Sequence, residues 1–155
     1  MNDRAAILLA TWGGCGYFPT GQGTAASIVA AGLACGAVEG LGVAPAWFLA
    51  AALLLWFPAV WSAGLAAKHF GRHDPPQVVV DEVVGQWIAV AAVARGEWLS
   101  WLAALVLFRF FDIAKPWPIR KLEALPGGVG VVADDAAAGL CAMIVLVGLH
   151  YFSLV

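Results

Sequence analysis

Apolar residues gather into five long runs, separated by short stretches rich in glycine, proline and charged residues. These runs predict helices at residues 24–43, 46–67, 78–94, 98–114 and 136–155. The first two and the last contain about 20 residues each, which is enough to cross the ~30 Å hydrocarbon core of a bilayer. The other two contain about 17 residues and would extend only ~25 Å, so that pair forms either a marginal spanning hairpin or a shallow, re-entrant one.

A shorter apolar run, residues 5–12, precedes the first long one and is too short to cross a bilayer. It predicts an interfacial or re-entrant segment at the N-terminal end of the bundle. A glycine-rich loop at residues 13–24 follows it.

The polar connections between the runs predict which segments share one side of the membrane. Residues 39–45 and 95–97 form the tips of two predicted hairpins. If both hairpins cross, the other polar segments meet on the opposite side; these are residues 13–24, 68–76, 81–82, 109–121 and 134–135. Most lysines and arginines fall on that side, and Arg95 alone lies opposite. The positive-inside rule then predicts that this side faces the cytoplasm and that the C-terminus lies outside.

The composition agrees with a membrane protein. Hydrophobic residues make up 63% of the 155 residues, charged residues only 12%, and the mean hydropathy is +0.88. A water-soluble surface needs roughly twice that charged share. We therefore predict an all-α, polytopic integral membrane helical bundle: two helical hairpins plus a C-terminal helix, in a single domain over residues 1–155. The three cysteines are odd in number and lie in apolar surroundings, so we interpret them as small buried hydrophobic residues.

Carboxylates occur in pairs near the start of two predicted helices. Asp81 and Glu82 begin one, Asp134 and Asp135 precede the other, and Asp112 lies near the end of a third. A carboxylate can cap a helix N-terminus, but one acid would suffice for that role. Adjacent acids in an apolar segment are better explained by a bound cation or a proton-transfer role. Five carboxylates on one side favour a hard divalent ion with oxygen ligands, and Mg²⁺ is the usual candidate where phosphate is also a ligand.

Basic residues follow the fourth apolar run and end at two prolines. Arg109, Asp112 and Lys115 recur at every third position, so on a helix they would share roughly one face. Pro116 and Pro118 prevent that helix from continuing. Two cations and a carboxylate at the end of a hydrophobic segment predict a site for a polyanion at the membrane surface.

Other polar residues near these segments have two interpretations each. Arg120 and Lys121 either bind the anion or anchor the chain to lipid headgroups. Thr24 and Ser27, after the glycine-rich loop, either cap a helix or face a ligand. His73, beside Asp74, is a candidate acid or a solvated side chain.

Several classes of site are excluded by missing motifs. The glycine-rich loop lacks the Gly-Lys-Ser/Thr of a nucleotide-binding P-loop, and no Gly-x-Ser-x-Gly elbow or Cys/His zinc spacing occurs. The alternative that stays open is an ion-coupled membrane transporter with an acidic cation site. A transporter would carry acids midway along its helices, whereas here they gather at predicted helix ends.

Three blocks of the sequence resemble the phosphatidylglycerophosphatase A family. They are Val80-Asp81-Glu82-Val83-Val84-Gly85, the segment from Phe108 to Arg120, and the segment from Gly127 to Asp135. The blocks occur in the family's order over nearly the whole chain. The first block of the family departs here, because Gln22 stands where a proline is common and Ala26 where a glycine is.

The resemblance implies a Mg²⁺-dependent lipid phosphatase of the bacterial inner membrane, with its active site on the cytoplasmic side. Such an enzyme hydrolyses phosphatidylglycerophosphate to phosphatidylglycerol and phosphate. We expect three groups of residues: metal ligands Asp81, Glu82, Asp134 and Asp135; catalytic residues Asp81, Asp112 and Asp134; substrate-binding residues Thr24, Arg109, Lys115 and Arg120. Direct attack by water and an aspartyl-phosphate intermediate both stay open, as does selectivity among lipid phosphates.

Overall fold

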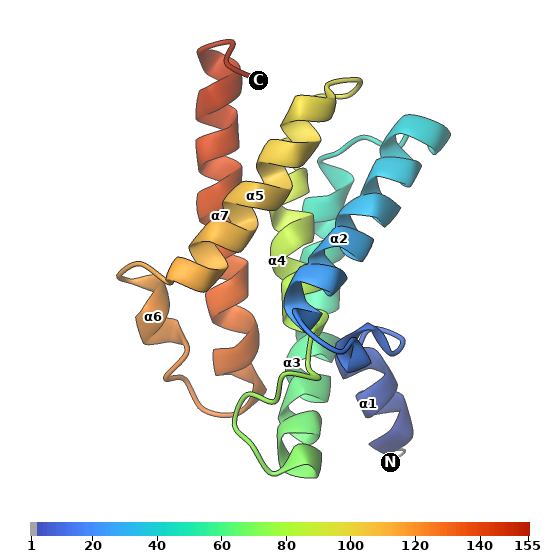
Figure 1. The fold of residues 1–155 in the computed structure, drawn as a ribbon, viewed down its shortest axis with the longest axis vertical. Helices are drawn as coiled ribbons and strands as arrows, with labels where there is room; N and C mark the ends of the chain where they lie inside the picture. The colour runs from blue at the N-terminus through green and yellow to red at the C-terminus, as the bar shows by residue number, and fades with distance from the viewer. Residues whose placement is uncertain (1–2) are drawn as a thin grey trace.

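The computed structural model describes residues 3–155 and confirms an all-helical fold (Figure 1). Its helices are α1 (Asp3–Ala10), η1 (Cys15–Tyr17), α2 (Gln22–Cys35), η2 (Gly36–Gly40), α3 (Trp47–Phe70), α4 (Val80–Val90), α5 (Trp98–Ala114), α6 (Ile119–Leu122) and α7 (Gly128–Tyr151). The π-helix η2 continues α2 directly. The boundaries of α5 agree with the predicted helix at 98–114.

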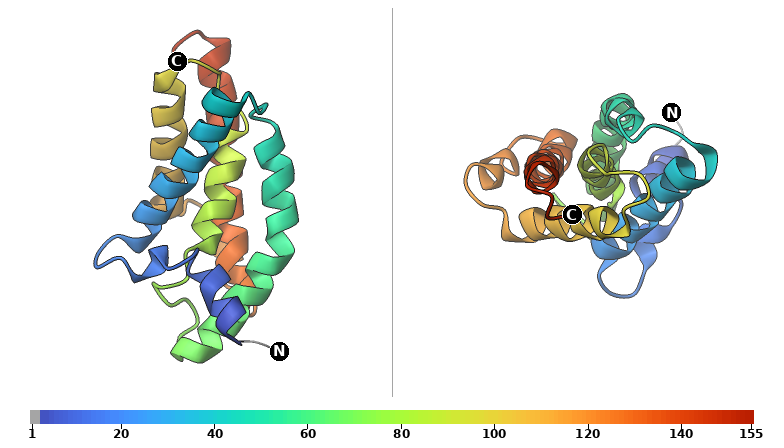
Figure 2. Two further views of the ribbon diagram at one scale, coloured as in Figure 1. Left: turned by 90° about the vertical axis from the view of Figure 1, so that its right-hand side faces the viewer. Right: turned by 90° about the horizontal axis from the view of Figure 1, so that it is seen from above.

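The short helix α4, with 11 residues, lies at the centre of the bundle. Seen from above, α4 lies between α2, α3, α5 and α7 (Figure 2). Nine of its eleven residues are buried, Asp81 among them. The neighbouring helices thus cover α4, and the acids at its first turn lie in the interior of the bundle.

The two hairpin tips meet at one end of the bundle. Glu39 accepts hydrogen bonds from the backbone N–H of Gly96 at 3.1 Å and from the indole N–H of Trp101 at 3.0 Å. Arg95 donates to the carbonyl of Val43 at 3.1 Å. The glycine-rich loop, the α3–α4 loop and α6 lie toward the other end (Figure 1). This is the arrangement expected if residues 39–45 and 95–97 are the tips of two hairpins.

Within residues 3–155, three helical segments are long and apolar enough to cross a membrane: Gln22–Gly40, Trp47–Phe70 and Gly128–Tyr151. The prediction of a 17-residue helix at 78–94 is wrong, because α4 has only 11 residues and an expected length of ~16 Å. It cannot cross ~30 Å of hydrocarbon by itself. The helix ends at Val90, and the irregular residues that follow it lead to the exposed hairpin tip at 95–97.

The last helix begins eight residues before its predicted start. We expected a helix from residue 136, but α7 begins at Gly128. A Cβ on Gly128 would lie 2.0 Å from the carbonyl oxygen of Val60 on α3, so only glycine allows these helices to approach so closely. Asp134 and Asp135 therefore lie inside α7, about 9–10 Å along its axis, and do not cap it.

A second close contact joins α4 to α7. A Cβ on Gly139 would lie 2.2 Å from the carbonyl oxygen of Gly85, and one on Gly85 would lie 2.6 Å from that of Asp135. The two backbones touch here because neither helix carries a side chain at the crossing. This contact brings Asp135 beside the first turn of α4.

Candidate active site

A cavity of about 200 Å³ lies where α4 begins, among the ends of α2 and α5, the α3–α4 loop and the first turns of α7. Its lining consists of Gly21, Gln22, Gly23, Asp74, Pro76, Val78, Asp81, Glu82, Arg109, Asp112, Lys115, Val131, Asp134 and Asp135. Six of these residues are acids and two are bases. Segments more than 100 residues apart in sequence thus meet at one polar cavity.

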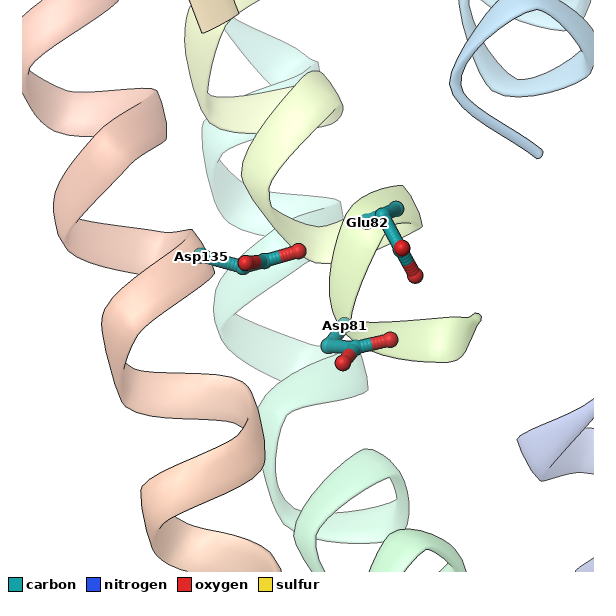
Figure 3. Close-up of side chains that lie close together, drawn as sticks. All are labelled: Asp81, Glu82 and Asp135. Atoms are coloured by element: carbon teal, nitrogen blue, oxygen red, sulfur yellow. The ribbon is translucent and has the colours of Figure 1, made fainter. Parts of the chain in front are cut away.

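Three carboxylates of the cavity form a compact cluster. Asp81 and Glu82 extend from the first turn of α4, and Asp135 points toward them from α7 (Figure 3). One oxygen from each lies within 4.8 Å of the others, and Asp81 and Asp135 are only 6% and 4% exposed. Burial, with the charges of Glu82 and Asp135, raises the pKa of the Asp81 carboxyl well above its ordinary value. The cluster therefore needs a cation if all three groups are to be ionised together.

The unpaired oxygens of this cluster fit a metal ion. Oδ1 of Asp81, Oε2 of Glu82 and Oδ2 of Asp135 are buried and have no hydrogen-bond partner among the described residues. An unpartnered buried carboxylate oxygen is costly, and a hard cation bound through oxygen removes that cost. These side chains could hold a metal ion.

Arg109 provides the first positive charge of the cavity. Its Nη1 lies 2.7 Å from Oδ2 of Asp112, one helical turn further along α5, and 3.9 Å from Oε1 of Glu82. The same nitrogen is 3.5 Å from the hydroxyl of Ser27 on α2. Asp112 thus orients the guanidinium toward the carboxylate cluster, and its own position is fixed by that bond.

Lys115 provides the second positive charge of the cavity. We predicted it on one helical face with Arg109 and Asp112, but it lies just beyond the C-terminal end of α5. It follows the last residue of α5 with a left-handed backbone (φ 39°), so it does not continue the face of Arg109 and Asp112. This turn directs its ammonium to Oδ2 of Asp134 at 2.6 Å, with Glu123 at 3.7 Å. Burial alone would lower the pKa of Lys115, but the hydrogen bond and charge of Asp134 outweigh burial and raise it. Lys115 therefore stays cationic at any physiological pH.

The start of α2 closes the cavity, and at Gly23 there is no room for a side chain while Glu82 keeps its position. A Cβ on Gly23 would lie 2.0 Å from Oε1 of Glu82 and 3.1 Å from Nη1 of Arg109. Gly21, in the left-handed conformation, precedes the helix, so the first N–H groups of α2 have no partner within it. Free N–H groups at a helix N-terminus favour a bound anion.

Most of the predicted site residues line this cavity. Asp81, Glu82, Asp112, Asp134, Asp135, Arg109 and Lys115 are all present in its wall. Thr24 and Arg120 are exposed and do not line it. Asp134 is bonded to Lys115 and leaves Oδ1 as its unpaired oxygen, so its expected role as a metal ligand rests on that atom alone. The acids were expected at helix ends, and this is correct for the first turn of α4 and the last turn of α5 but wrong for Asp134 and Asp135, which lie in the second turn of α7.

Seven residues of the cavity wall were not among the predicted site residues, and Asp74, Gln22 and Gly23 are three of them. Asp74 lies in the α3–α4 loop, where we had considered it only as a neighbour of His73; His73 itself does not line the cavity. Gln22 and Gly23 contribute from the start of α2. Both residues lie where a glycine-rich loop leads into an apolar helix, and this pattern could have identified them as site residues. The pattern does not indicate which glycine contacts Glu82.

The chain is similar to known proteins over most of its length. The family model described as Phosphatidylglycerophosphatase A matches residues 8–150. A Bacteroides thetaiotaomicron protein with the provisional name phosphatidylinositol-3-phosphatase is 39% identical over 144 residues, which is 90% of each chain.

Two further relatives are named Phosphatidylglycerophosphatase A. The one from Haemophilus influenzae is 46% identical over 85 residues, or 54% of this chain and 52% of the relative. The one from Escherichia coli is 41% identical over 88 residues, or 56% of this chain and 48% of the relative. No solved structure matches the chain.

Proposed function

Because the chain belongs to the phosphatidylglycerophosphatase A family of membrane lipid phosphatases, we propose that it hydrolyses phosphatidylglycerophosphate to phosphatidylglycerol and inorganic phosphate with the aid of Mg²⁺. The observation that carries this proposal is the meeting of three clustered carboxylates with Arg109 and Lys115 in one cavity. Its volume of about 200 Å³ corresponds to roughly seven water molecules at ~30 Å³ each. That is room for a phosphate group, an ion and a few waters.

In this proposal the carboxylates hold the metal and the basic residues hold the substrate. Asp81, Glu82 and Asp135 would bind Mg²⁺, with Asp134 as a further ligand through its free oxygen. When bound, the ion supplies Lewis-acid polarisation of the phosphoryl oxygens. Arg109 and Lys115 would bind those oxygens and stabilise the charge that spreads over them in the transition state.

The remaining residues position these groups. Asp112 orients Arg109, which is consistent with a role beside the reacting phosphate. Asp134 orients Lys115, whose raised pKa suits it to bind an anion and makes it a poor proton donor. If water attacks, its oxygen bonds to phosphorus, the ester bond to the lipid glycerol breaks, and the proton that the water loses balances the proton that the departing oxygen takes up. If the carboxylate of Asp81 or Asp112 attacks, the departing oxygen takes up a proton from solvent, and water then hydrolyses the acyl phosphate, which releases phosphate and a proton and restores the carboxylate.

The distribution of basic residues supports a proposal for the side of the membrane on which the cavity lies. The cavity lies at the end of the bundle that carries most lysines and arginines, which the positive-inside rule assigns to the cytoplasm. We propose that the enzyme acts at the cytoplasmic face of a bacterial inner membrane, on a phospholipid whose acyl chains stay in the bilayer.

Phosphate release from defined lipids tests the proposal. The purified protein in detergent should release phosphate from phosphatidylglycerophosphate with Mg²⁺ present and stop when EDTA is added. Asp81→Asn and Asp135→Asn should abolish release, whereas Glu97→Gln, an exposed acid near the opposite end, should have no effect. Absence of release from any lipid phosphate would reject the phosphatase and favour the transporter. Acid quenching during turnover would trap a phosphorylated protein if a carboxylate attacks, and no phosphorylated protein if water attacks directly.

The Bacteroides thetaiotaomicron relative supports a second candidate substrate, phosphatidylinositol 3-phosphate. Its headgroup also presents a phosphomonoester, so the same cavity could bind it. A higher kcat/KM for this lipid than for phosphatidylglycerophosphate would replace the first substrate and leave the proposed chemistry unchanged.

A further inference from the structure

An apolar groove runs along the outer surface of α2, next to the polar cavity. Its lining consists of Phe18, Thr20, Gly21, Thr24, Ala25, Ile28 and Val29. Gly21 lines both the groove and the cavity, so the two lie next to each other at that residue. The groove therefore lies between the proposed phosphate site and the hydrocarbon around the bundle.

The groove follows one face of the helix. Residues 21, 24, 25, 28 and 29 recur at the helical spacing of three and four, which puts them in one stripe. Small residues form its floor, and its apolar walls are well exposed: Phe18 by 56%, Ile28 by 53% and Val29 by 41%. From Gly21 to Val29 the stripe extends about 12 Å, close to the ~15 Å hydrocarbon depth of one leaflet.

The groove is apolar along its whole length. Thr20 and Thr24 line it together with Phe18 on the side of the cavity, and Ala25, Ile28 and Val29 line the part further along α2. A phospholipid presents a phosphate, then the glycerol esters, then the acyl chains. Since the cavity has room for little beyond a phosphate group, the rest of the lipid must lie outside it.

We propose that this groove binds an acyl chain of the lipid substrate, with Thr20 and Thr24 beside the glycerol esters and Ile28 and Val29 against the chain. The proposal rests on the phosphatase function above and adds to it a determinant of specificity for lipid over soluble phosphomonoesters. It also gives Thr24, which does not line the cavity, a contact with substrate.

Filling the groove tests the proposal. Ala25→Phe would occupy its floor, and displacing two methylenes of an acyl chain costs about fifteenfold in affinity, at roughly fourfold each. The ratio of kcat/KM for long-chain phosphatidylglycerophosphate to kcat/KM for glycerol 3-phosphate should therefore fall by about that factor. The matched control is Ala50→Phe, in a separate apolar groove on α3, for which the ratio should stay constant. An unchanged ratio in Ala25→Phe, or an equal loss on both substrates, would overturn the proposal.

A second measurement needs no turnover and so separates failure of the groove from failure of the phosphatase. The probe is phosphatidylglycerophosphate with a photoreactive diazirine in one acyl chain. Labelling should map to residues 25–29 and should fall in Ala25→Phe but not in Ala50→Phe. Labelling confined to other helices would overturn the proposal, as would a change in oligomeric mass in Ala25→Phe, because α2 would then contact a second copy.

Discussion

Gly23→Ala should separate activity from stability, because the new methyl group meets only the ends of two side chains. Its Cβ would lie 2.0 Å from Oε1 of Glu82, and Cβ atoms essentially never approach within 3.0 Å of another heavy atom. Glu82 must therefore move by at least about 1 Å, and Arg109, at 3.1 Å, must give way slightly. A misplacement of about 1 Å in a catalytic site can cost about a hundredfold in rate, equivalent to ~2.7 kcal/mol of transition-state stabilisation.

The fold should tolerate this substitution. Gly23 lies in the first turn of α2, and replacing a helical glycine by alanine favours the helix by up to about 1 kcal/mol. We expect Tm in detergent to stay constant or rise while kcat/KM falls about a hundredfold and Mg²⁺ binds more weakly. Gly32→Ala is the matched control on the same helix, because its Cβ would meet nothing within 4 Å. Near wild-type kcat/KM in Gly23→Ala would refute a catalytic or metal-binding role for Glu82 at its present position.

Three further predictions concern the charge pair, the helix contact and pH. Lys115→Met should lower the free energy of unfolding by roughly 3 kcal/mol, because it leaves Asp134 buried without its partner. It should also lower kcat/KM. If chemical unfolding shows unchanged stability while activity is lost, the expected destabilisation is contradicted. Gly139→Ala should lower Tm by forcing α7 away from α4, at about 1–3 kcal/mol, whereas Gly148→Ala, whose Cβ meets open space, should not. Because the pKa of Asp81 is raised, the metal-free protein should lose stability as pH rises from the ordinary carboxyl pKa through that raised value, since the unfolded chain ionises first. Mg²⁺ requires the ionised form, so its affinity and the Tm gain on adding it should increase with pH; titration calorimetry showing a pH-independent affinity would exclude this linkage.

The sequence alone determined the class of fold and most of the helices. Long apolar runs and a low charged fraction suit only a lipid-exposed helical bundle, and α3 and α5 begin and end within three residues of the predicted bounds. The acidic and basic blocks were also recognisable, because carboxylates in apolar segments are rare without a function. The orientation across the membrane and the role of each site residue stay predictions.

Only the tertiary structure decided where α4 and α7 begin and end. Glycines 128 and 130 suggested a loop by local propensity, yet α7 includes them because its backbone packs against α3 there. The predicted helix at 78–94 ends at Val90, and α4 is packed among α2, α3, α5 and α7, a placement that its apolar sequence did not specify. Packing energy outweighs a propensity difference of about 1 kcal/mol per glycine.

The pairing of charges in the cavity was likewise beyond the sequence. Asp134 and Asp135 are adjacent in the chain, but a turn of 100° per residue directs one to Lys115 and the other to the acids of α4. Coulomb energy depends on distances of a few ångströms between side chains from different helices. Those distances are set by how α4, α5 and α7 pack, which no local pattern of residues specifies.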